Sequence, residues 1–533
     1  MRKQTVTFLS LTLAFTVLMS LPWLVPHMGW TVLIGLLPLL IMERMATLSG
    51  TRHFCWWHYA CFVLWNAATT WWVGGATVAG AIFAILANAL QMSVIFASFR
   101  QVKKRLGGVL PYLYLAAAWI AWERFYLTGA QISWPWLVLG NAFADTTALV
   151  QWYSVLGTLG GSLWAWTVNL SLFALMVAVS DGRMVCWNGK ARTAAFCGTL
   201  LALFGPMVWS ACLRFEEEGE PLNVLIGQPN YDPYEKFQSL PQAQQDAHYL
   251  MLLEQADWSR PGPVLVLAPE TFTSGLRTDQ VERNETFLRF RSFLARHPQA
   301  TLLFGASTYE PVYAYACPDP CAYDFGALPD GRHEWLLEHN SALVTDAGGH
   351  YSMYHKKKLV VGVELTPYPK LFVPIEKLLG GNLMGKCIGQ KEIACLPVNG
   401  IPVGTAICYE SVYGEFCTGY VRKGAQLLAV ITNDAWWGDT PGYRQHLNFS
   451  RLRAIETRRW VARCGNTGIS AIIDPAGHIV SRTPWWEPTI LEGSVQLLQG
   501  ETFFVRYGDV TGRLSVFVFL LLALAALFRP KKL

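Results

Sequence analysis

The chain has 533 residues, of which 52% are apolar and only 15% are charged, whereas about a quarter of the residues in an ordinary soluble domain are charged. The length predicts more than one structural unit, and the composition predicts a membrane protein. The net charge of +5 is small for this length, and the basic residues gather at the ends of apolar segments, so nucleic-acid binding is not expected.

Seven apolar stretches precede residue 215, and an eighth lies close to the end of the chain. Each is near the roughly 20 residues that a helix needs to cross a bilayer. They cover residues 6–25, 29–46, 56–74, 77–98, 109–124, 155–178, 194–213 and 514–528. We therefore expect a seven-helix transmembrane bundle at 1–215, a domain of mixed polarity at 216–510, and a closing transmembrane helix with a basic cytoplasmic tail at 511–533.

The short loops between these stretches alternate in charge. If the N-terminus is cytoplasmic, every even-numbered crossing returns to a loop rich in lysine and arginine, and the opposite loops carry few. These basic residues are Arg44, Arg52, Arg100, Lys103, Lys104, Arg105, Arg183, Lys190, Arg192, Arg529, Lys531 and Lys532. The pattern predicts a multi-pass protein of the cytoplasmic membrane, with the 216–510 domain on its outer side.

Aromatic and polar residues near the segment ends fit this interpretation. Tryptophan is typical of the lipid–water interface, and we expect that position for Trp56, Trp57, Trp71, Trp72, Trp134 and Trp136. Glu123 and Arg124, at the outer end of the fifth segment, are expected to reach the same interface. Asn169, inside the sixth segment, is expected to form a hydrogen bond between helices.

Short β-strand patterns alternate with helical patterns between residues 216 and 510, which predicts an α/β domain with mixed sheets. The turn Asn399-Gly400 between two apolar runs predicts a hairpin. The region from CPDPC to Asn340 fits neither pattern and is treated as an insertion. Two close cysteine pairs, Cys317 with Cys321 and Cys387 with Cys395, either form local disulfides outside the cytoplasm or remain thiols.

Three residues of reactive types follow apolar strand patterns in this domain: Glu270 ends VLAPE, Lys356 lies in YHKKKLVVGVE, and Cys408 ends GTAIC. Taken singly, they have ordinary explanations as a solvated carboxylate, a charged turn and a buried thiol. Together they supply the groups that acyl transfer needs, because strand ends are where α/β proteins gather reactive groups. A carboxylate can accept the thiol proton, and an ammonium, together with the backbone N–H of Tyr409, can stabilise the oxyanion of a tetrahedral intermediate.

This Glu–Lys–Cys order resembles the nitrilase superfamily, and the chain most resembles its membrane branch, the apolipoprotein N-acyltransferase family. The matching motifs are PE at 269–270, YxKxxLVxxxE at 354–364, CYE at 408–410, TNDAWWG at 432–438, QH at 445–446, RxRAIE at 451–456, NTGIS at 466–470 and LTGAQISWPWLVLGNA at 127–142. The resemblance implies an α-helical transmembrane bundle of eight helices joined to an α/β nitrilase-like αββα sandwich. It also implies the bacterial inner membrane, with the catalytic domain on the periplasmic side.

The resemblance assigns roles to individual residues. Cys408 would be the nucleophile, Glu270 the general base and Lys356 the oxyanion stabiliser, while Glu364 would orient the lysine or the incoming amine. Supporting and substrate-binding roles fall to Tyr409, Glu410, Trp436, Tyr231 and Tyr234, the last two as substitutes for a tryptophan that some members carry. The neighbouring Lys357 and Lys358 are expected to face solvent.

The resemblance also implies the reaction and the partners. An acyl chain would pass from a membrane phospholipid, through a Cys408 thioester, to the α-amine of the N-terminal diacylglyceryl-cysteine of a lipoprotein. No metal or organic cofactor is expected, since no ligand cluster is recognisable in the sequence, and a monomer is expected. Two alternatives remain: a membrane-anchored nitrilase-type amidase that shares the triad, and a lipid- or lipoprotein-binding scaffold without activity.

Overall fold

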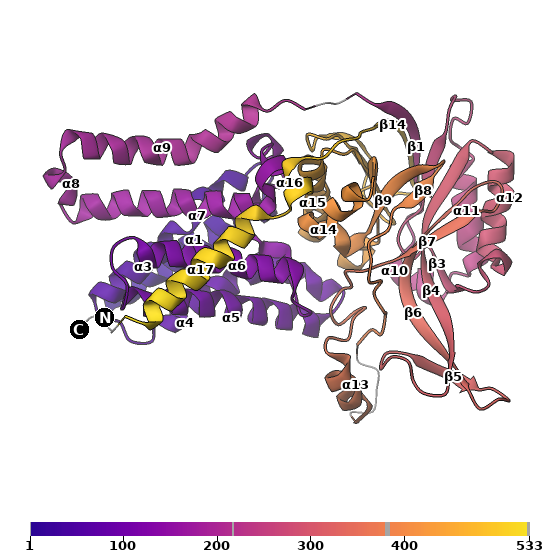
Figure 1. Ribbon diagram of the computed structural model, residues 1–533, viewed down its shortest axis with the longest axis horizontal. Coiled ribbons are helices and arrows are strands. Elements are labelled where there is room, and N and C mark those ends of the chain that lie inside the picture. The colour runs from indigo at the N-terminus through magenta and orange to yellow at the C-terminus, as the bar shows by residue number, and fades with distance from the viewer. Residues whose placement is uncertain (1, 216–217, 379–383, 530–533) are drawn as a thin grey trace.

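The computed structural model describes residues 2–215, 218–378 and 384–529, and it has two parts that lie side by side (Figure 1). Long helices from the N-terminal part of the chain form one end, and α17 (Val510–Leu527) packs against them. A domain of strands and shorter helices forms the other end. The start of α1 and the end of α17 lie together at the end of the bundle that is far from the strands (Figure 1).

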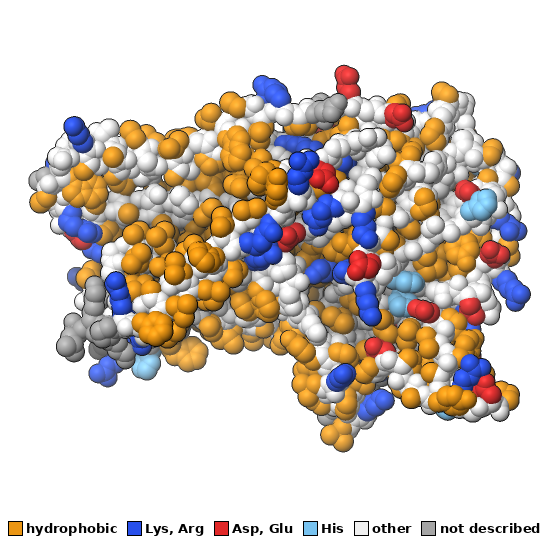
Figure 2. Space-filling view, in the orientation of Figure 1, with side chains coloured by type: hydrophobic (Ala, Val, Ile, Leu, Met, Phe, Trp, Pro, Cys, Tyr) orange, Lys and Arg blue, Asp and Glu red, His pale blue; other side chains and the backbone are white. Residues whose placement is uncertain are grey.

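The helical part follows the apolar stretches of the sequence, and all eight predicted stretches lie on helices. Besides α17, its helices are α1 (Arg2–Leu24), α2 (Val32–Gly35), α3 (Leu37–Leu48), α4 (Phe54–Thr70), α5 (Val78–Lys103), α6 (Leu110–Thr128), α7 (Tyr153–Ser180), α8 (Arg183–Cys186) and α9 (Gly189–Cys212). Hydrophobic side chains cover most of the visible face of this part (Figure 2). This is the surface that a lipid environment requires.

Within the described ranges, six helical stretches are long and apolar enough to cross a membrane. They are Lys3–Leu24, Gly29–Leu48, Val78–Lys103, Tyr153–Ser180, Gly189–Cys212 and Val510–Leu527. The remaining two predicted spans fall on α4, which has only 17 residues, and on α6, which contains Glu123 and Arg124. The count of eight spans therefore stays a prediction.

Two β-sheets form the core of the other part. The first has the order β14-β1-β2-β4-β6-β5, with β3 beside β4 and β7 beside β6. Its strands are β1 (Glu220–Gln228), β2 (Val264–Leu267), β3 (Thr273–Arg277), β4 (Ala300–Ala314), β5 (Tyr323–Ala327), β6 (His333–Thr345), β7 (Tyr351–His355) and β14 (Thr489–Leu497). The second, in the order β13-β12-β11-β10-β9-β8, contains β8 (Leu396–Val398), β9 (Ile401–Ile407), β10 (Leu427–Thr432), β11 (Val461–Gly465), β12 (Ala471–Ile473) and β13 (Ile479–Arg482).

The two sheets pack face to face between helices, which gives an αββα sandwich. Apolar side chains of β1 and β2, such as Val224 and Leu265, share one core with Ala429 of β10. Helices α11 (Gln242–Leu253) and α12 (Glu285–Arg296) cover the first sheet, and α14 (Gly414–Arg422) and α15 (Pro441–Thr457) cover the second. The shorter helices are α10 (Pro233–Gln238), α13 (Pro369–Leu378) and α16 (Phe503–Tyr507). The predicted sandwich fold is confirmed.

The sequence analysis left the CPDPC region unassigned, and it is regular structure. Strands β4 and β6 run on as a long antiparallel pair and β5 adds to β6, so the insertion is an extension of the first sheet. The charged and aromatic residues that alternate along these strands obscured the β-strand pattern in the sequence. The predicted hairpin at Asn399-Gly400 does join β8 to β9. Both cysteine pairs that were offered as disulfides are free thiols.

Several polar and aromatic residues of the bundle face the sandwich rather than lipid, which corrects the interfacial prediction. Trp72 and Trp136 are buried, and the ring centroid of Trp437 lies 4.6 Å from that of Trp72 and 5.8 Å from that of Trp136. Arg124 pairs with Asp509 Oδ2 at 2.8 Å and with Glu415 Oε2 at 3.1 Å.

Inside the bundle, the Glu123 carboxylate is buried and accepts from the backbone N–H of Leu139, so it does not reach the lipid interface. Asn169 forms the expected interhelical bonds, donating to Val32 O at 2.8 Å and accepting from Leu36 N at 3.0 Å.

Candidate active site

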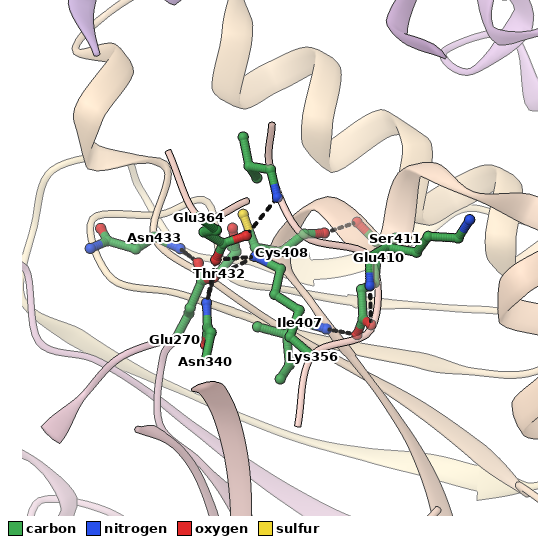
Figure 3. Close-up of polar contacts among 12 residues, drawn as sticks. Glu270, Asn340, Lys356, Glu364, Ile407, Cys408, Glu410, Ser411, Thr432 and Asn433 are labelled. Atoms are coloured by element: carbon green, nitrogen blue, oxygen red, sulfur yellow. Dashed lines mark hydrogen bonds and ion pairs between the residues drawn. The ribbon is translucent and has the colours of Figure 1, made fainter. Parts of the chain in front are cut away.

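Three strand ends bring the predicted reactive residues together. Glu270 follows β2, Lys356 follows β7, and Cys408 follows β9 and begins a short 3-10 helix, η7 (Cys408–Val412). Figure 3 shows the sulfur of Cys408 beside the side chains of Glu270, Lys356 and Glu364. Since β2 and β7 belong to the first sheet and β9 to the second, the site lies where the sheets meet.

Lys356 is held between two carboxylates. Its Nζ lies 3.0 Å from Glu270 Oε1 and 2.8 Å from Glu364 Oε1, and the side chain is fully buried. Burial alone would lower the pKa of Lys356, but the two carboxylates, with a smaller contribution from Cys408, outweigh it and hold that pKa well above its ordinary value. The ammonium is therefore a fixed positive charge next to the sulfur.

Both carboxylates are also oriented by neutral donors. Asn340 Nδ2 donates to Glu270 Oε1 at 2.7 Å and to Glu364 Oε1 at 2.6 Å. The backbone N–H of Asn433 donates to Glu270 Oε2 at 3.1 Å, and that of Val360 to Glu364 Oε2 at 2.7 Å. These contacts fix the positions of the two carboxylates before any substrate arrives, as electrostatic preorganisation requires.

Cys408 sits on a sharp turn between strand and helix. Its φ is +49°, a left-handed conformation that is uncommon for a residue with a side chain and is often found at functional sites. Burial, followed by the charge of Glu270, raises the pKa of the Cys408 thiol well above its ordinary value, although Lys356 opposes this shift. The resting residue is therefore a thiol, and it needs a base to become a nucleophile.

Glu410 ties the strand that carries Cys408 to the segment that carries Lys356. It is fully buried, and its carboxylate accepts from the backbone N–H groups of Lys357 at 2.7 Å and Ile407 at 2.9 Å, and from Tyr354 Oη at 2.7 Å. These bonds join the ends of β7 and β9. Glu410 therefore sets the distance between the two reactive groups without contacting the sulfur in this arrangement.

A second polar group supports the turn from the side of α15. His446 Nε2 donates to Cys408 O at 3.1 Å, and its Nδ1 lies 2.9 Å from Asp434 Oδ1. Asp434 is paired through its other oxygen with Arg463 at 2.5 Å. Burial would raise the pKa of Asp434, but His446 and Arg463 outweigh it and hold that pKa below its ordinary value. Asp434 and Arg463 therefore hold His446 in place against the backbone of the Cys408 turn.

Tyr409 faces the helical bundle. Its hydroxyl donates to Ser133 O at 3.1 Å, and its ring stacks on Trp134 with 6.4 Å between centroids. Trp136 in the same loop donates to Gln445 Oε1 at 2.6 Å, and Gln445 in turn donates to Trp23 O at 3.0 Å. One wall of the site thus comes from the helical bundle, next to Tyr409 and therefore close to Cys408.

The predicted substrate-binding residues fall into two groups. Trp436 is partly exposed on the 3-10 helix η8 (Asp434–Trp437), with its ring edge-on to Tyr234 at 5.6 Å and stacked on Phe237 at 6.0 Å. Tyr234 is exposed. Tyr231 is buried instead, and its hydroxyl donates to Gln245 O at 2.5 Å, so no surface is left on it for a substrate.

Comparison with known proteins places this arrangement in a family. The family model described as "Apolipoprotein N-acyltransferase N-terminal domain" matches residues 15–171, and "Carbon-nitrogen hydrolase" matches residues 242–502. The chain belongs to the apolipoprotein N-acyltransferase family. The two models together cover the helical bundle as far as α7 and nearly the whole sandwich, so membership extends over both parts of the molecule.

Relatives named apolipoprotein N-acyltransferase align over most of the chain. The one from Chlorobaculum tepidum is 28% identical over 521 residues, which is 96% of this chain and 94% of that protein. The one from Geobacter metallireducens is 29% identical over 426 residues, 79% and 75% of the two chains. Among solved structures, Saccharomyces cerevisiae Nit3 of the nitrilase superfamily matches 53% of this chain and 93% of its own, with 16% identity and a TM-score of 0.36.

The sequence analysis named most of the side chains in this site but missed the residues that hold them in place. Asn340 lay in the unassigned region, although it contacts both carboxylates. Asp434 and His446 were named only as parts of the motifs TNDAWWG and QH. For Asp434 the sequence did offer a signal, because it is a polar residue that follows a strand. Lys358 was expected to face solvent but lies partly buried, with its Nζ 4.9 Å from the centroid of the Tyr413 ring.

The expectation that no metal is required stays a prediction, although the fold brings possible ligand atoms together that the sequence does not show as a cluster. Two groups have suitable donor atoms close together: Cys408 with Asp434 and His446, and Glu310 with His339 and His355. In the first group, the guanidinium of Arg463 already pairs with Asp434, so a cation occupies the place that a metal would need. The first group supports the Cys408 turn, and the second lies outside the candidate active site.

Changing Glu270 to glutamine is expected to lower the pKa of Cys408. The Glu270 carboxylate contributes to the raised pKa of that thiol, and the neutral amide removes this contribution, so the thiolate forms at a lower pH. Alkylation of the Cys408 peptide by iodoacetamide, followed by mass spectrometry from pH 6 to 10, should show the rate rising at lower pH in the variant. An alkylation profile that moves to higher pH would contradict this electrostatic arrangement.

Changing His446 to asparagine is expected to reduce turnover by about 10- to 100-fold with little change in KM, because a misplaced nucleophile slows chemistry more than binding. His446→Gln, whose longer amide can still donate to Cys408 O, should recover part of the loss. His478→Ala, which removes an exposed histidine paired with Asp474, is the matched control. Equal activity of the asparagine variant and the wild type would show that His446 does not position Cys408.

Proposed function

We propose that the protein is an apolipoprotein N-acyltransferase that works through a Cys408 acyl-enzyme. In the first half-reaction, Cys408 Sγ attacks an ester carbonyl of a membrane phospholipid, and Glu270 takes the thiol proton. Lys356 stabilises the oxyanion of the tetrahedral intermediate. The intermediate collapses as the ester C–O bond breaks, Glu270 returns the proton to the departing oxygen, and a lysophospholipid leaves behind a thioester.

The second half-reaction uses the same groups in the other direction. The α-amine of a lipoprotein's N-terminal diacylglyceryl-cysteine attacks the thioester carbonyl. Glu270 accepts a proton from the amine, Lys356 stabilises the second oxyanion, and the C–S bond breaks. The new amide is released, and the Cys408 thiolate regains its proton from Glu270. Glu364 keeps Lys356 in place in both halves, since its oxygen is bonded to that ammonium at 2.8 Å.

The observation that carries this proposal is that the sandwich and the helical bundle both border the site. The Glu270–Lys356–Cys408 group meets the bundle through Tyr409, whose hydroxyl donates to Ser133 O and whose ring stacks on Trp134. A thiol nucleophile bordered by the apolar bundle suits two substrates that both carry acyl chains. Holding them at the membrane surface raises their effective concentration at the sulfur.

The same proposal includes the orientation and extent of the parts. We infer a monomer in the bacterial inner membrane, with the bundle at 1–215, the catalytic domain at 216–510 on the periplasmic side, and the closing helix at 511–533. Trp436 and Tyr234 are proposed to contact the acyl chains, and Tyr231 is left out because it is buried. To test the orientation, Lys104 and Lys391 are each changed to cysteine. The labelling of each variant by a thiol reagent is then measured from one side of intact membranes.

The decisive experiment separates transfer from hydrolysis. Detergent-solubilised protein is incubated with a phospholipid that carries a labelled acyl chain and with a diacylated lipopeptide. The proposal predicts triacylated lipopeptide and lysophospholipid in equal amounts. Free labelled fatty acid without lipopeptide acylation would instead favour a membrane-anchored nitrilase-type amidase or hydrolase, and the absence of both products would favour a binding scaffold.

A further inference from the structure

Three strands of the first sheet place one metal-binding side chain each at a single point. Glu310 lies on β4, His339 on β6 and His355 at the end of β7. One ring nitrogen of each histidine and one carboxylate oxygen of Glu310 all lie within 4.8 Å of one another. The two imidazole rings are stacked, with 4.1 Å between their centroids.

The register of the strands explains this grouping. Thr308 of β4 is opposite His339 of β6, and Ser341 of β6 is opposite His355 of β7. Because side chains alternate between the two faces of a strand, Glu310 shares the face of Thr308, and all three donors project from the same side of the sheet. Asn340, the next residue along β6, projects from the other side and reaches the active site.

Both rings are held by hydrogen bonds from their Nδ1 atoms. His339 Nδ1 donates to Ile388 O at 2.6 Å, and His355 Nδ1 lies 2.7 Å from Ser341 Oγ. Ser341 Oγ is itself 2.7 Å from Thr308 Oγ1. Such contacts are typical of the partners that fix the tautomer of a metal-bound histidine, and they leave Nε2 of each ring available as a ligand.

One of these nitrogens makes no hydrogen bond inside the protein, although a carboxylate oxygen lies close to it. His339 is only 4% exposed, and its Nε2 makes no hydrogen bond. Glu310 Oε2 lies 3.3 Å from it. A buried polar atom without a partner is costly in a folded protein and points to a missing ligand.

We propose that Glu310, His339 and His355 form a binding site for a divalent transition-metal ion such as Zn²⁺. Two imidazoles and one carboxylate are a ligand set that zinc takes in proteins, with a water as the fourth ligand. Glu310 is half-exposed, so an ion can enter from solvent. The site does not depend on the proposed acyl transfer, because its ligands face away from Cys408.

The ion would have a structural role. It would join β4, β6 and β7, and two of these strands lead directly to active-site groups: Asn340 follows His339, and Lys356 follows His355. Locking the strands together would fix the positions of that amide and that ammonium. No bond is made or broken in this role, and no proton transfer is required of the metal.

The test is metal binding by the full chain, purified through a tag that contains no histidine and stripped with EDTA. Equilibrium dialysis against Zn²⁺, with metal counted by mass spectrometry, is expected to give one tightly bound ion per chain. Glu310→Gln and His355→Ala should each weaken that binding by at least about tenfold. His478→Ala removes an exposed histidine beside Asp474 and should leave the stoichiometry and affinity unchanged.

A second measurement covers the case in which His355→Ala folds poorly. Glu310 is half-exposed, so Glu310→Gln should fold normally, and Zn²⁺ should raise the melting temperature of the wild type but not that of this variant. Co²⁺ in the same site should give the visible absorption of a four- or five-coordinate ion. A wild-type chain that holds no stoichiometric Zn²⁺, or a Glu310→Gln chain that binds it as tightly as the wild type, would overturn the proposal.

Discussion

Replacing Lys356 with methionine is expected to slow acyl transfer strongly and to destabilise the catalytic domain at the same time. Lys356 Nζ is the shared partner of the Glu270 and Glu364 carboxylates, and all three side chains are buried. Removing one partner of a buried ion pair leaves an uncompensated charge and costs about 3–5 kcal/mol of unfolding free energy. Loss of one oxyanion donor reduces turnover by about 10²- to 10³-fold.

A double variant separates these two consequences. Changing Glu364 to glutamine in the Lys356→Met background removes one of the two uncompensated charges, so the melting temperature should partly recover while activity stays lost. Thermal unfolding and acyl-transfer assays on the wild type, Lys356→Met, Glu364→Gln and the double variant complete the cycle. Recovery of activity in the double variant, or wild-type turnover in Lys356→Met, would show that the lysine does not stabilise the oxyanion.

Replacing Cys408 with alanine is expected to reduce acyl transfer by about 10⁴-fold or more, because the groups around a covalent nucleophile cannot replace it. The domain should remain folded, since the Lys356 ion pairs and the Glu410 hydrogen bonds do not involve the sulfur. Phospholipid binding should persist. Cys317→Ala, which removes an exposed free thiol, is the control and should transfer acyl chains at the wild-type rate.

Much of the architecture was predictable because it depends on local patterns. Apolar stretches of bilayer length located the long helices, and the β patterns that end in Glu270, Lys356 and Cys408 located the strand ends that meet in the site. The resemblance of the motifs to one family then singled out Lys356 from three consecutive lysines. Its buried pairing with Glu270 and Glu364 agrees with that choice.

The contacts between the two parts were not predictable, since they join residues that are far apart in the chain. Trp72 and Trp136 have the sequence context of interfacial residues, yet they are buried against Trp437. Asp434 and His446 acquire their role only when α15 packs beneath the Cys408 turn. For the same reason, Glu310, His339 and His355 show no metal-binding spacing in the sequence, because strand register alone brings them together.

The central claim is that the acyl chain is held on Cys408 between the two half-reactions. Mass spectrometry of the protein after incubation with a phospholipid of known chain length tests it most directly. The account predicts a mass increase of that acyl group on the peptide containing Cys408, which disappears when a diacylated lipopeptide is added. Formation of triacylated lipopeptide without any adduct on Cys408, or an adduct on another residue that supplies the lipopeptide, would contradict it.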